Sequence, residues 1–439
     1  MKRWIALFAL ILTLAALPAL AAAADAETAL WPACDEETGL WGYIREDGSW
    51  GIAPQYRYAY RFMNGYAIVD ADDASGIIDE TGWYVVPPEY SIWEGTIGFD
   101  GRKGNGVFVM ERNGRCGWFD TQSGFISGLM WQHVDSWDDS PYVQVGINRD
   151  MSTFVHRATG KRLLPWQDMS TYGFREDVAV VSLGDGDTVL VALDGSITHL
   201  PEGLTAADSY VCDGLLPVTD ENGLYGFVDT DGQIVIDPQF TDAMNFRCGY
   251  AVVNDGLLID RTGRVIAEDV QFVCGPWADG SIAVERAGCW AVLNADGRSP
   301  AGSTERFRIP LEPYAYGRSI ITYAPLEDAA PWWVGYAYGG VGTDFGLMTD
   351  DGEWLVDADD NDVCLCLDNE GFSDDPMGWQ GTGYGGGYVD LYGNEVFPAQ
   401  WYYAEHFDGA LARVWFNEEW TGAGYINRDG EMVYQWTEE

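Results

Sequence analysis

Basic residues are scarce in this chain: 24 Lys and Arg stand against 69 Asp and Glu among 439 residues, and the formal net charge is −45. Nucleic acids and anionic lipid surfaces would be repelled by so acidic a protein, which excludes both as expected partners. The same charge favours solubility, and it leaves proteins, polysaccharides and cations as the partners to consider.

Histidine is also scarce, with four in the whole chain, His133, His156, His199 and His406. They are far apart in sequence, so no H-E-x-x-H metal motif is present. The chain also lacks a G-x-S-x-G nucleophile turn and a glycine-rich phosphate loop that carries Lys. We therefore expect no catalytic residue and no cofactor, and the protein is expected not to be an enzyme.

Long apolar runs are absent after the first residues. Lys2 and Arg3 precede an almost wholly apolar stretch at 4–20, and four alanines follow at 21–24. This order is typical of a secretory signal peptide, so residues 1–24 are predicted to be one. We expect the rest of the protein outside the cell or in the cell envelope, with no membrane contact beyond the signal sequence.

Eight cysteines follow the apolar segment. An even number permits disulfides in an oxidising compartment, but eight cysteines allow 105 pairings and the sequence does not choose among them. Buried free thiols remain an equal alternative. Cys364 and Cys366 are the one close pair, and no histidine lies near them, so the spacing does not predict a zinc site.

Glycine and aromatic residues are abundant, with 54 Gly, 20 Trp and 24 Tyr. A short pattern recurs: an aromatic or small residue, Gly, an apolar run, an Asp-Gly or Thr-Gly turn, and a second apolar run often followed by Pro and an aromatic. Its clearest copies begin at Trp41, Tyr225 and Gly387. Repetition at this period indicates an array of supersecondary units.

One glycine marks the turn of each unit. Successive turn glycines are 31 to 42 residues apart, except for one interval of 55. They are Gly48, Gly82, Gly124, Gly160, Gly195, Gly232, Gly263, Gly297, Gly352, Gly393 and Gly430. The spacing divides the mature chain into a lead-in at 25–39, a repeat array at 40–297, an irregular insertion or eroded repeat at 298–351, and further repeats at 352–436.

Each unit reads as three short strands. Residues 246–253 enter a strand, Asn254-Asp255-Gly256 form a tight turn, 257–260 return, and 265–267 make the third strand after another turn. The fold class is therefore predicted to be all-β, a tandem array of about 10–11 three-stranded antiparallel meanders, as an open twisted solenoid or propeller-like. Because typical propellers hold four to eight blades, we favour an open array or two closed groups divided at 298–351.

These units resemble the WG repeat, the KWG-type repeat of bacterial proteins. Residues 40–69, 224–253 and 387–414 match it best, and the likeness extends over about 40–436. The resemblance implies a binding or structural module, and it transfers no catalytic residue.

Aromatic side chains are the first candidates for ligand contact, because exposed rings stack on sugars. Most aromatics recur at fixed repeat positions, which favours packing between units. Trp332 and Trp333 lie in the irregular stretch, off the repeat, and are the leading ligand-binding candidates. The groups 401–403 and Trp415 with Trp420 are crowded with aromatics as well.

Acidic residues give a weaker metal candidate. Asp357, Asp359, Asn361 and Asp368 have oxygen ligands at positions that a calcium loop would use. The sixth position is Asp362 where such a loop needs Gly, so a solvated acidic turn is favoured.

Three functions follow from these patterns. The leading hypothesis is an exported scaffold at the cell surface or envelope that binds a protein or a polysaccharide. The alternatives are a secreted carboxylate-dependent glycan hydrolase on a propeller-like fold and a calcium-stabilised adhesion module.

Overall fold

The computed structural model contains strands, turns and loops. It describes residues 29–94, 105–136, 140–148, 151–246, 249–254, 256–270, 272–274, 282–286, 289–293, 318–323, 332–338, 343–348, 354–356, 364–365, 377–381, 385–390 and 394–437, with no account of the side chains in 272–381 or of Glu94 and His406. No helix occurs in these residues, and hence none that is long and apolar enough to cross a membrane.

The described strands form ten antiparallel sheets. The first five sheets contain β1 (Trp31–Cys34), β2 (Trp41–Ile44) and β3 (Trp50–Tyr56); β4 (Tyr58–Ala59), β5 (Tyr66–Ala71), β6 (Ala74–Asp79), β7 (Tyr84–Glu94), β8 (Val107–Arg112), β9 (Arg115–Asp120) and β10 (Phe125–Ile126); β11 (His133–Asp135), β12 (Tyr142–Gly146) and β13 (Ser152–His156); β14 (Met169–Ser170), β15 (Phe174–Arg175), β16 (Val178–Leu183), β17 (Thr188–Ala192) and β18 (Ile197–His199); and β19 (Thr205–Ala206), β20 (Leu215–Thr219), β21 (Tyr225–Asp229) and β22 (Ile234–Phe240).

The other five sheets complete the array. They contain β23 (Tyr250–Val253), β24 (Leu257–Asp260) and β25 (Val265–Ala267); β26 (Phe272–Cys274), β27 (Ile282–Arg286) and β28 (Cys289–Leu293); β29 (Arg318–Tyr323), β30 (Trp332–Tyr338), β31 (Thr343–Met348) and β32 (Trp354–Val356); β33 (Cys364–Leu365), β34 (Met377–Gly381), β35 (Gly385–Val389) and β36 (Glu395–Trp401); and β37 (Tyr403–Asp408), β38 (Leu411–Trp415), β39 (Gly422–Asn427) and β40 (Met432–Thr437).

The all-β repeat prediction is confirmed, with one difference in strand number. The seven-stranded sheet holds two successive meanders joined through β7, so the described strands make eleven units, one for each turn glycine. Four sheets have four strands, and the sheet of β14 to β18 has five, where three were expected. The extra strand comes from the segment that connects two units: β19, for example, pairs antiparallel with β20.

Local chemistry sets the turns between the second and third strands. The eight turn glycines within the described residues have φ between +68° and +86°, a region open to glycine at little cost. At Gly232 an aspartate at the end of β21 closes the turn. The Oδ1 atom of Asp229 accepts the backbone N–H groups of Asp231 at 3.0 Å and Gln233 at 2.8 Å.

The glycine after the aromatic residue has a different role. At Gly226 an added Cβ atom would lie 2.6 Å from the Ile236 carbonyl oxygen and 2.7 Å from the Pro238 nitrogen. These atoms come close because β22 is irregular there: Tyr225 pairs with Phe240 and Phe227 with Ile236, so extra residues bulge toward β21. Gly42 faces Pro54 in the same way. The Gly and the Pro of these two repeats therefore lie in direct backbone contact, which leaves no room for a side chain at the glycine.

The hydrophobic cores lie between neighbouring sheets. In β20, Leu215 points into a core shared with Phe246 and Ile259 of the following unit. Leu216, one residue on, points into a core shared with Val180 of the preceding unit. Alternate residues of a strand point to opposite faces, so each sheet supplies two cores and depends on both neighbours.

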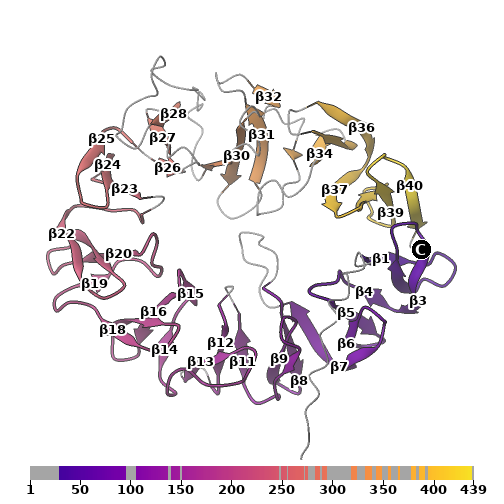
Figure 1. The fold of residues 1–439 in the computed structure, drawn as a ribbon, viewed down its shortest axis with the longest axis horizontal. Coiled ribbons are helices and arrows are strands. Elements are labelled where there is room, and N and C mark those ends of the chain that lie inside the picture. Colours follow the sequence, from indigo (N-terminus) through magenta and orange to yellow (C-terminus); the bar gives the residue numbers. More distant parts are fainter. Residues whose placement is uncertain are drawn as a thin grey trace, which may run out of the picture.

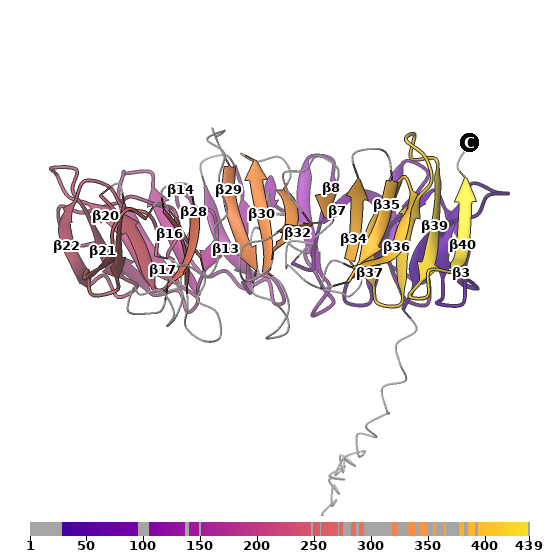
Figure 2. The same ribbon diagram turned by 90° about the horizontal axis from the view of Figure 1, so that it is seen from above.

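The sheets follow one another around a ring (Figure 1), and the ring is thin when it is seen from its edge (Figure 2). The first strand of a sheet lies nearer the middle and the last nearer the rim, as β23 and β25 show in Figure 1. The chain thus forms one array rather than two groups. Residues on either side of 298–351 belong to the same ring, and β29, β30 and β31 lie within that stretch.

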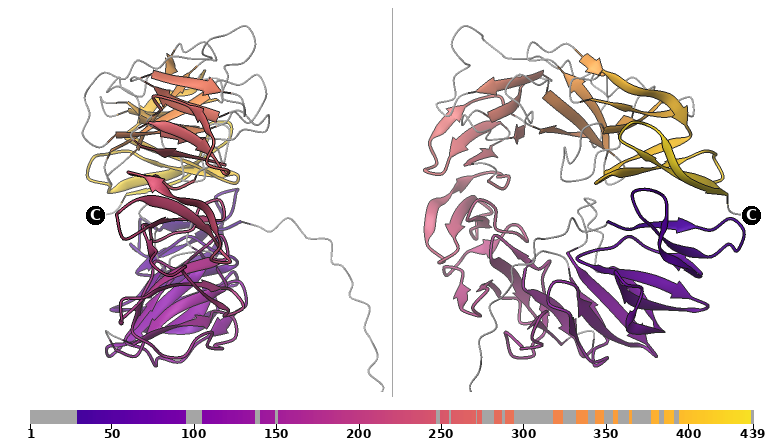
Figure 3. Two further views of the ribbon diagram at one scale, coloured as in Figure 1. Left: turned by 90° about the vertical axis from the view of Figure 1, so that its left-hand side faces the viewer. Right: turned by 45° about the vertical axis from the view of Figure 1, so that its right-hand side comes forward.

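The two ends of the array are in contact. The indigo first strands lie beside the yellow last strands (Figure 3), and β1 lies against β40. A single core joins Trp31 and Trp41 of the first sheet to Tyr425 and Trp436 of the last. The Tyr425 hydroxyl donates to the Pro32 carbonyl at 3.0 Å.

The hydrogen bond from a tyrosine hydroxyl to a backbone carbonyl, which joins the first and last units, also occurs between units adjacent in the chain. The Tyr43 hydroxyl donates to the Tyr60 carbonyl at 2.8 Å, and that of Tyr388 donates to the Glu405 carbonyl at 2.7 Å. In each case a tyrosine of the WG-type strand reaches backbone at the innermost part of the next sheet. The contact between first and last units is therefore of the same kind as an interior one.

Candidate functional site

A group of aromatic side chains lies at one end of the last sheet. Tyr403 pairs with Trp415, and Trp415 pairs with Ala423, so the start of β37, the end of β38 and the start of β39 lie at the same end. The connection between β38 and β39, residues 416–421, therefore lies beside Tyr402 and Tyr403. The sequence had placed these residues in two separate crowded groups, and the sheet brings them together.

Trp420 is at the centre of this group. Its ring centroid lies 5.1 Å from that of Trp415, 5.4 Å from Tyr403 and 5.6 Å from Tyr402, with tilted or edge-on geometry. Trp420 is nevertheless 46% exposed. We call Tyr402, Tyr403, Trp415 and Trp420 the Trp420 cluster.

A partly buried ionic group supports the cluster on the side that faces the first units. The Glu405 carboxylate accepts Arg413 Nε–H at 2.7 Å and Trp415 Nε1–H at 3.0 Å. It also accepts from Arg61, which belongs to the second unit and lies 344 residues away in sequence. The Arg413 guanidinium lies over the Trp415 ring, 5.1 Å from its centroid. Trp415 is thus held by an ion pair that ties the last unit to the second.

The charges around Glu405 determine the protonation state of its carboxyl group. Burial alone would raise the pKa of its carboxyl, but Arg413 and Arg61 outweigh burial and bring the pKa below the ordinary 4.5. Glu405 is therefore a fixed anion that positions its neighbours. A general acid would need the opposite shift.

Replacing Glu405 with glutamine is expected to change how stability depends on pH. Because the pKa is lower in the folded chain than in the unfolded one, the contribution of Glu405 is complete above about pH 4.5 and is lost as pH falls through the folded value. We expect Glu405→Gln to cost about 2 kcal/mol at pH 7, where it leaves two arginines without their anion. Melting temperatures of both proteins, measured from pH 7 to below 4, should converge on the acid side. A gap that stays constant with pH would contradict this account.

Histidine and serine also meet at one place, in the fourth unit. The Ser152 hydroxyl lies 3.4 Å from His133 Nε2, and the Asp135 carboxylate lies 3.9 Å from the same nitrogen. Burial raises the pKa of Asp135, and His133 only partly offsets it. A catalytic triad needs the serine and the carboxylate on opposite ring nitrogens of the histidine, so this group does not have the geometry of a triad.

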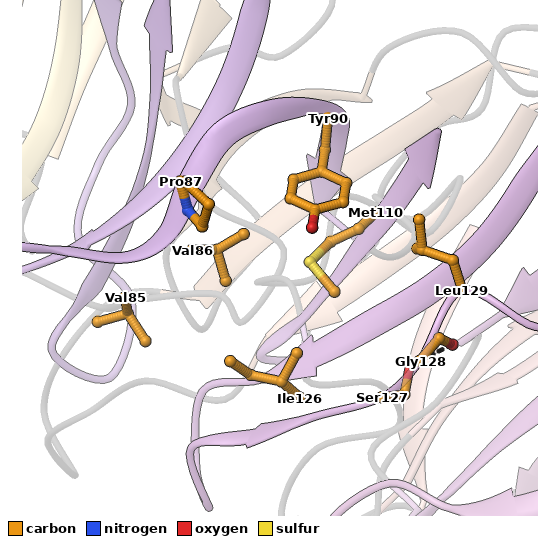
Figure 4. Close-up of a pocket in the computed structure, with 9 residues that line it drawn as sticks. All are labelled: Val85, Val86, Pro87, Tyr90, Met110, Ile126, Ser127, Gly128 and Leu129. Carbon is orange, nitrogen blue, oxygen red and sulfur yellow. Dashed lines mark hydrogen bonds between the residues drawn. The ribbon is translucent and has the colours of Figure 1, made fainter. Parts of the chain in front are cut away.

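A small apolar pocket lies between the second and third units, with a volume of about 210 Å³ (Figure 4). Val86, Tyr90, Met110, Ile126 and Leu129 are among the residues that line it, and none of its lining residues is charged. Ligand pockets usually reach about 300–1,000 Å³ and contain convergent polar groups. This pocket fits a single side chain better than a substrate.

The other candidates from the sequence lie elsewhere. Trp332 and Trp333 begin β30, where Trp333 pairs with Tyr323 on one side and Leu347 on the other, so they belong to a regular four-stranded sheet. The calcium candidates Asp357, Asp359, Asn361 and Asp368 lie outside the described residues, as do the turn glycines Gly297, Gly352 and Gly393. Within the described part of the chain, no three His, Cys, Asp or Glu side chains form a metal site.

Sequence reasoning missed the ionic half of this site. Arg61, Glu405 and Arg413 have no motif in common. Glu405 and Arg413 meet within the last sheet, and Arg61 joins them only where the ends of the ring meet. One local signal was available: Arg413 and Trp415 alternate along a strand, which places both side chains on the same face.

A model of the WG containing repeat matches residues 41–73, 225–256 and 387–420. The chain carries WG repeats. The third WG repeat ends at Trp420, so the whole Trp420 cluster lies within it. No curated protein matches the sequence.

Solved structures resemble the WG-repeat chain weakly. BamB from Moraxella catarrhalis is 15% identical over 66% of this chain and 97% of its own, with a TM-score of 0.30. A eukaryotic initiation factor is 10% identical over 75% and 95%, with a TM-score of 0.36, and Hsv2p of Kluyveromyces lactis is 10% identical over 57% and 92%, with 0.31. The fold of this chain therefore rests on its own strand pairing.

Proposed function

We propose that this WG-repeat protein is an exported binding scaffold of the cell surface or envelope, with a protein or a polysaccharide as its ligand. The observation that carries the proposal is the Trp420 cluster, an exposed tryptophan held by three aromatic rings. Exposed aromatic side chains with little freedom are typical of binding surfaces, since they lose little entropy on contact.

Two further features support a scaffold over an enzyme. Glu405 is ionised and fully engaged, and the His133 group lacks the geometry of a nucleophile and its base. Export is supported by the apolar segment at 4–20 with its basic start and alanine end.

The test combines fractionation with binding. The full-length chain is produced in a bacterium, its mature N-terminus is determined by mass spectrometry, and the purified mature protein is mixed with isolated cell envelopes. We expect cleavage near Ala24, accumulation outside the cytoplasm, and retention on envelopes without release of reducing sugar. A chain that keeps its first residues and stays in the cytoplasm would contradict export. Sugar release abolished by one carboxylate substitution would favour the hydrolase.

The calcium alternative has a separate measurement. If residues 357–368 bind calcium as the sequence pattern allows, EDTA should lower the melting temperature of the purified protein. An unchanged melting temperature would remove calcium-stabilised adhesion from consideration.

A further inference from the structure

Trp420 has a backbone conformation that folding alone does not explain. Its φ is +58°, in the left-handed region. The other eight described non-glycine residues with positive φ are Asn, Asp or Glu. Small polar side chains tolerate this region because they hydrogen-bond locally, whereas a bulky ring there is a strained outlier. Glycine or asparagine would serve this turn better.

The turn is held firmly in spite of that strain. The Asn417 Oδ1 atom accepts the Thr421 N–H at 3.0 Å, and the Phe416 N–H donates to the Gly422 carbonyl at 2.8 Å. Strained residues persist where their surroundings hold them, and they gather at functional sites. The turn presents Trp420 while three rings fix its orientation.

The groups beside Trp420 indicate the ligand chemistry. Glu418 and Glu419 are exposed and directly precede it. A carboxylate accepts two hydrogen bonds side by side, which matches neighbouring hydroxyls on a sugar ring, while an indole face matches the C–H face of that ring. The net charge of −45 disfavours an anionic ligand.

A protein ligand fits these surroundings less well. The centre of a protein interface is depleted in charged residues, because each buried carboxylate would need a partner. Two exposed glutamates stand next to the most exposed ring of this cluster. Sugar hydroxyls can satisfy carboxylates while they leave them partly hydrated.

We propose that the Trp420 cluster binds a pyranose unit of a neutral or amino-bearing polysaccharide, with the indole of Trp420 stacked on the sugar and Glu418 and Glu419 accepting from its hydroxyl or ammonium groups. This site rests on the proposed binding function and gives it a ligand class.

The experiment measures retention of the mature protein on cellulose, chitin, chitosan and polygalacturonate. It is done at about 1 M salt, where the Debye length is about 3 Å, so the net charge of the protein no longer attracts a charged polymer over longer distances. The variant is Trp420→Gly, since glycine suits a φ of +58° and keeps the turn. The matched control is Trp83→Gly, because Trp83 is 76% exposed and makes no ring contact with any described residue. A second variant, Trp420→Phe, keeps an aromatic ring at this position, so it still tests the site if the glycine variant does not fold.

We expect retention on at least one neutral or amino-bearing polymer and none on polygalacturonate. Trp420→Gly should weaken retention about tenfold or more, as removal of a central aromatic residue does, while Trp83→Gly binds as the parent does and Trp420→Phe keeps part of the affinity. Failure of the parent protein on every polymer would overturn the saccharide assignment; if it still bound envelopes, the scaffold function would stand with another ligand, a protein included. Full retention by Trp420→Gly would place the sugar site elsewhere on the ring.

Discussion

Gly226→Ala is expected to destabilise the array by about 3 kcal/mol, although it adds a single methyl group. The new Cβ would lie 2.6 Å from the Ile236 carbonyl oxygen and 2.7 Å from the Pro238 nitrogen, both of them backbone atoms. Backbone of the neighbouring strand cannot rotate away as a flexible side chain can, so the bulge in β22 would have to move. Circular dichroism during thermal or urea unfolding would measure the loss.

Gly223→Ala provides the control in the same sheet. Gly223 has φ of +76°, but an added Cβ would meet nothing within 4 Å. We expect it to cost about 1 kcal/mol, the price of the backbone conformation alone. If both variants lost the same stability, the close approach of Gly226 to the backbone at Ile236 and Pro238 would have no special role, because a glycine without that contact would be as costly to replace.

The second large effect is expected at Arg157, one of few basic residues in this acidic chain. Its Nε–H donates to Asp120 Oδ1 at 2.6 Å, and its terminal nitrogen donates to the Asn105 carbonyl at 2.7 Å. Asp120 belongs to the third unit and Arg157 to the fourth, and both are buried. Arg157→Met should cost about 3–5 kcal/mol, because it leaves the Asp120 carboxylate buried without a counter-charge.

A double variant separates the charge from the packing. In Arg157→Met with Asp120→Leu, no buried charge remains, and we expect most of the lost stability to return. Urea unfolding of the two single variants and the double variant gives the coupling energy of the pair. A double variant as unstable as the sum of the singles would show that the two side chains act independently and would contradict the ion-pair explanation.

The features that were predictable from the sequence are local ones. Strand alternation, the aspartate turn and the positive φ of Gly232 all depend on residues within one unit, so a short window of sequence contains the information. The number of units follows from the same turns. The fourth strand of several sheets was missed because β19, for example, is only Thr205–Ala206 and carries no apolar alternation.

Contacts between distant segments were beyond such reasoning. Gly226 can be recognised in the sequence as a repeat position. The reason that only glycine fits there is a bulge in the next strand, and the sequence does not show that bulge. Arg61 and Glu405 are 344 residues apart, and only the ring sets them side by side. Position off the repeat singled out Trp332–Trp333, whereas the strained φ of Trp420 is visible in three dimensions alone.

The bond from Tyr425 to the Pro32 carbonyl shows that neighbouring sheets hold together without a peptide link between them. The positions of the chain ends are therefore not dictated by the ring. A circular permutant in which β40 is joined to β1, with new ends between β22 and β23, should fold into the same ring. Gene duplication is more restricted: an added unit alters the angle at every junction, so arrays of this kind should change length only where all their junctions can adjust together.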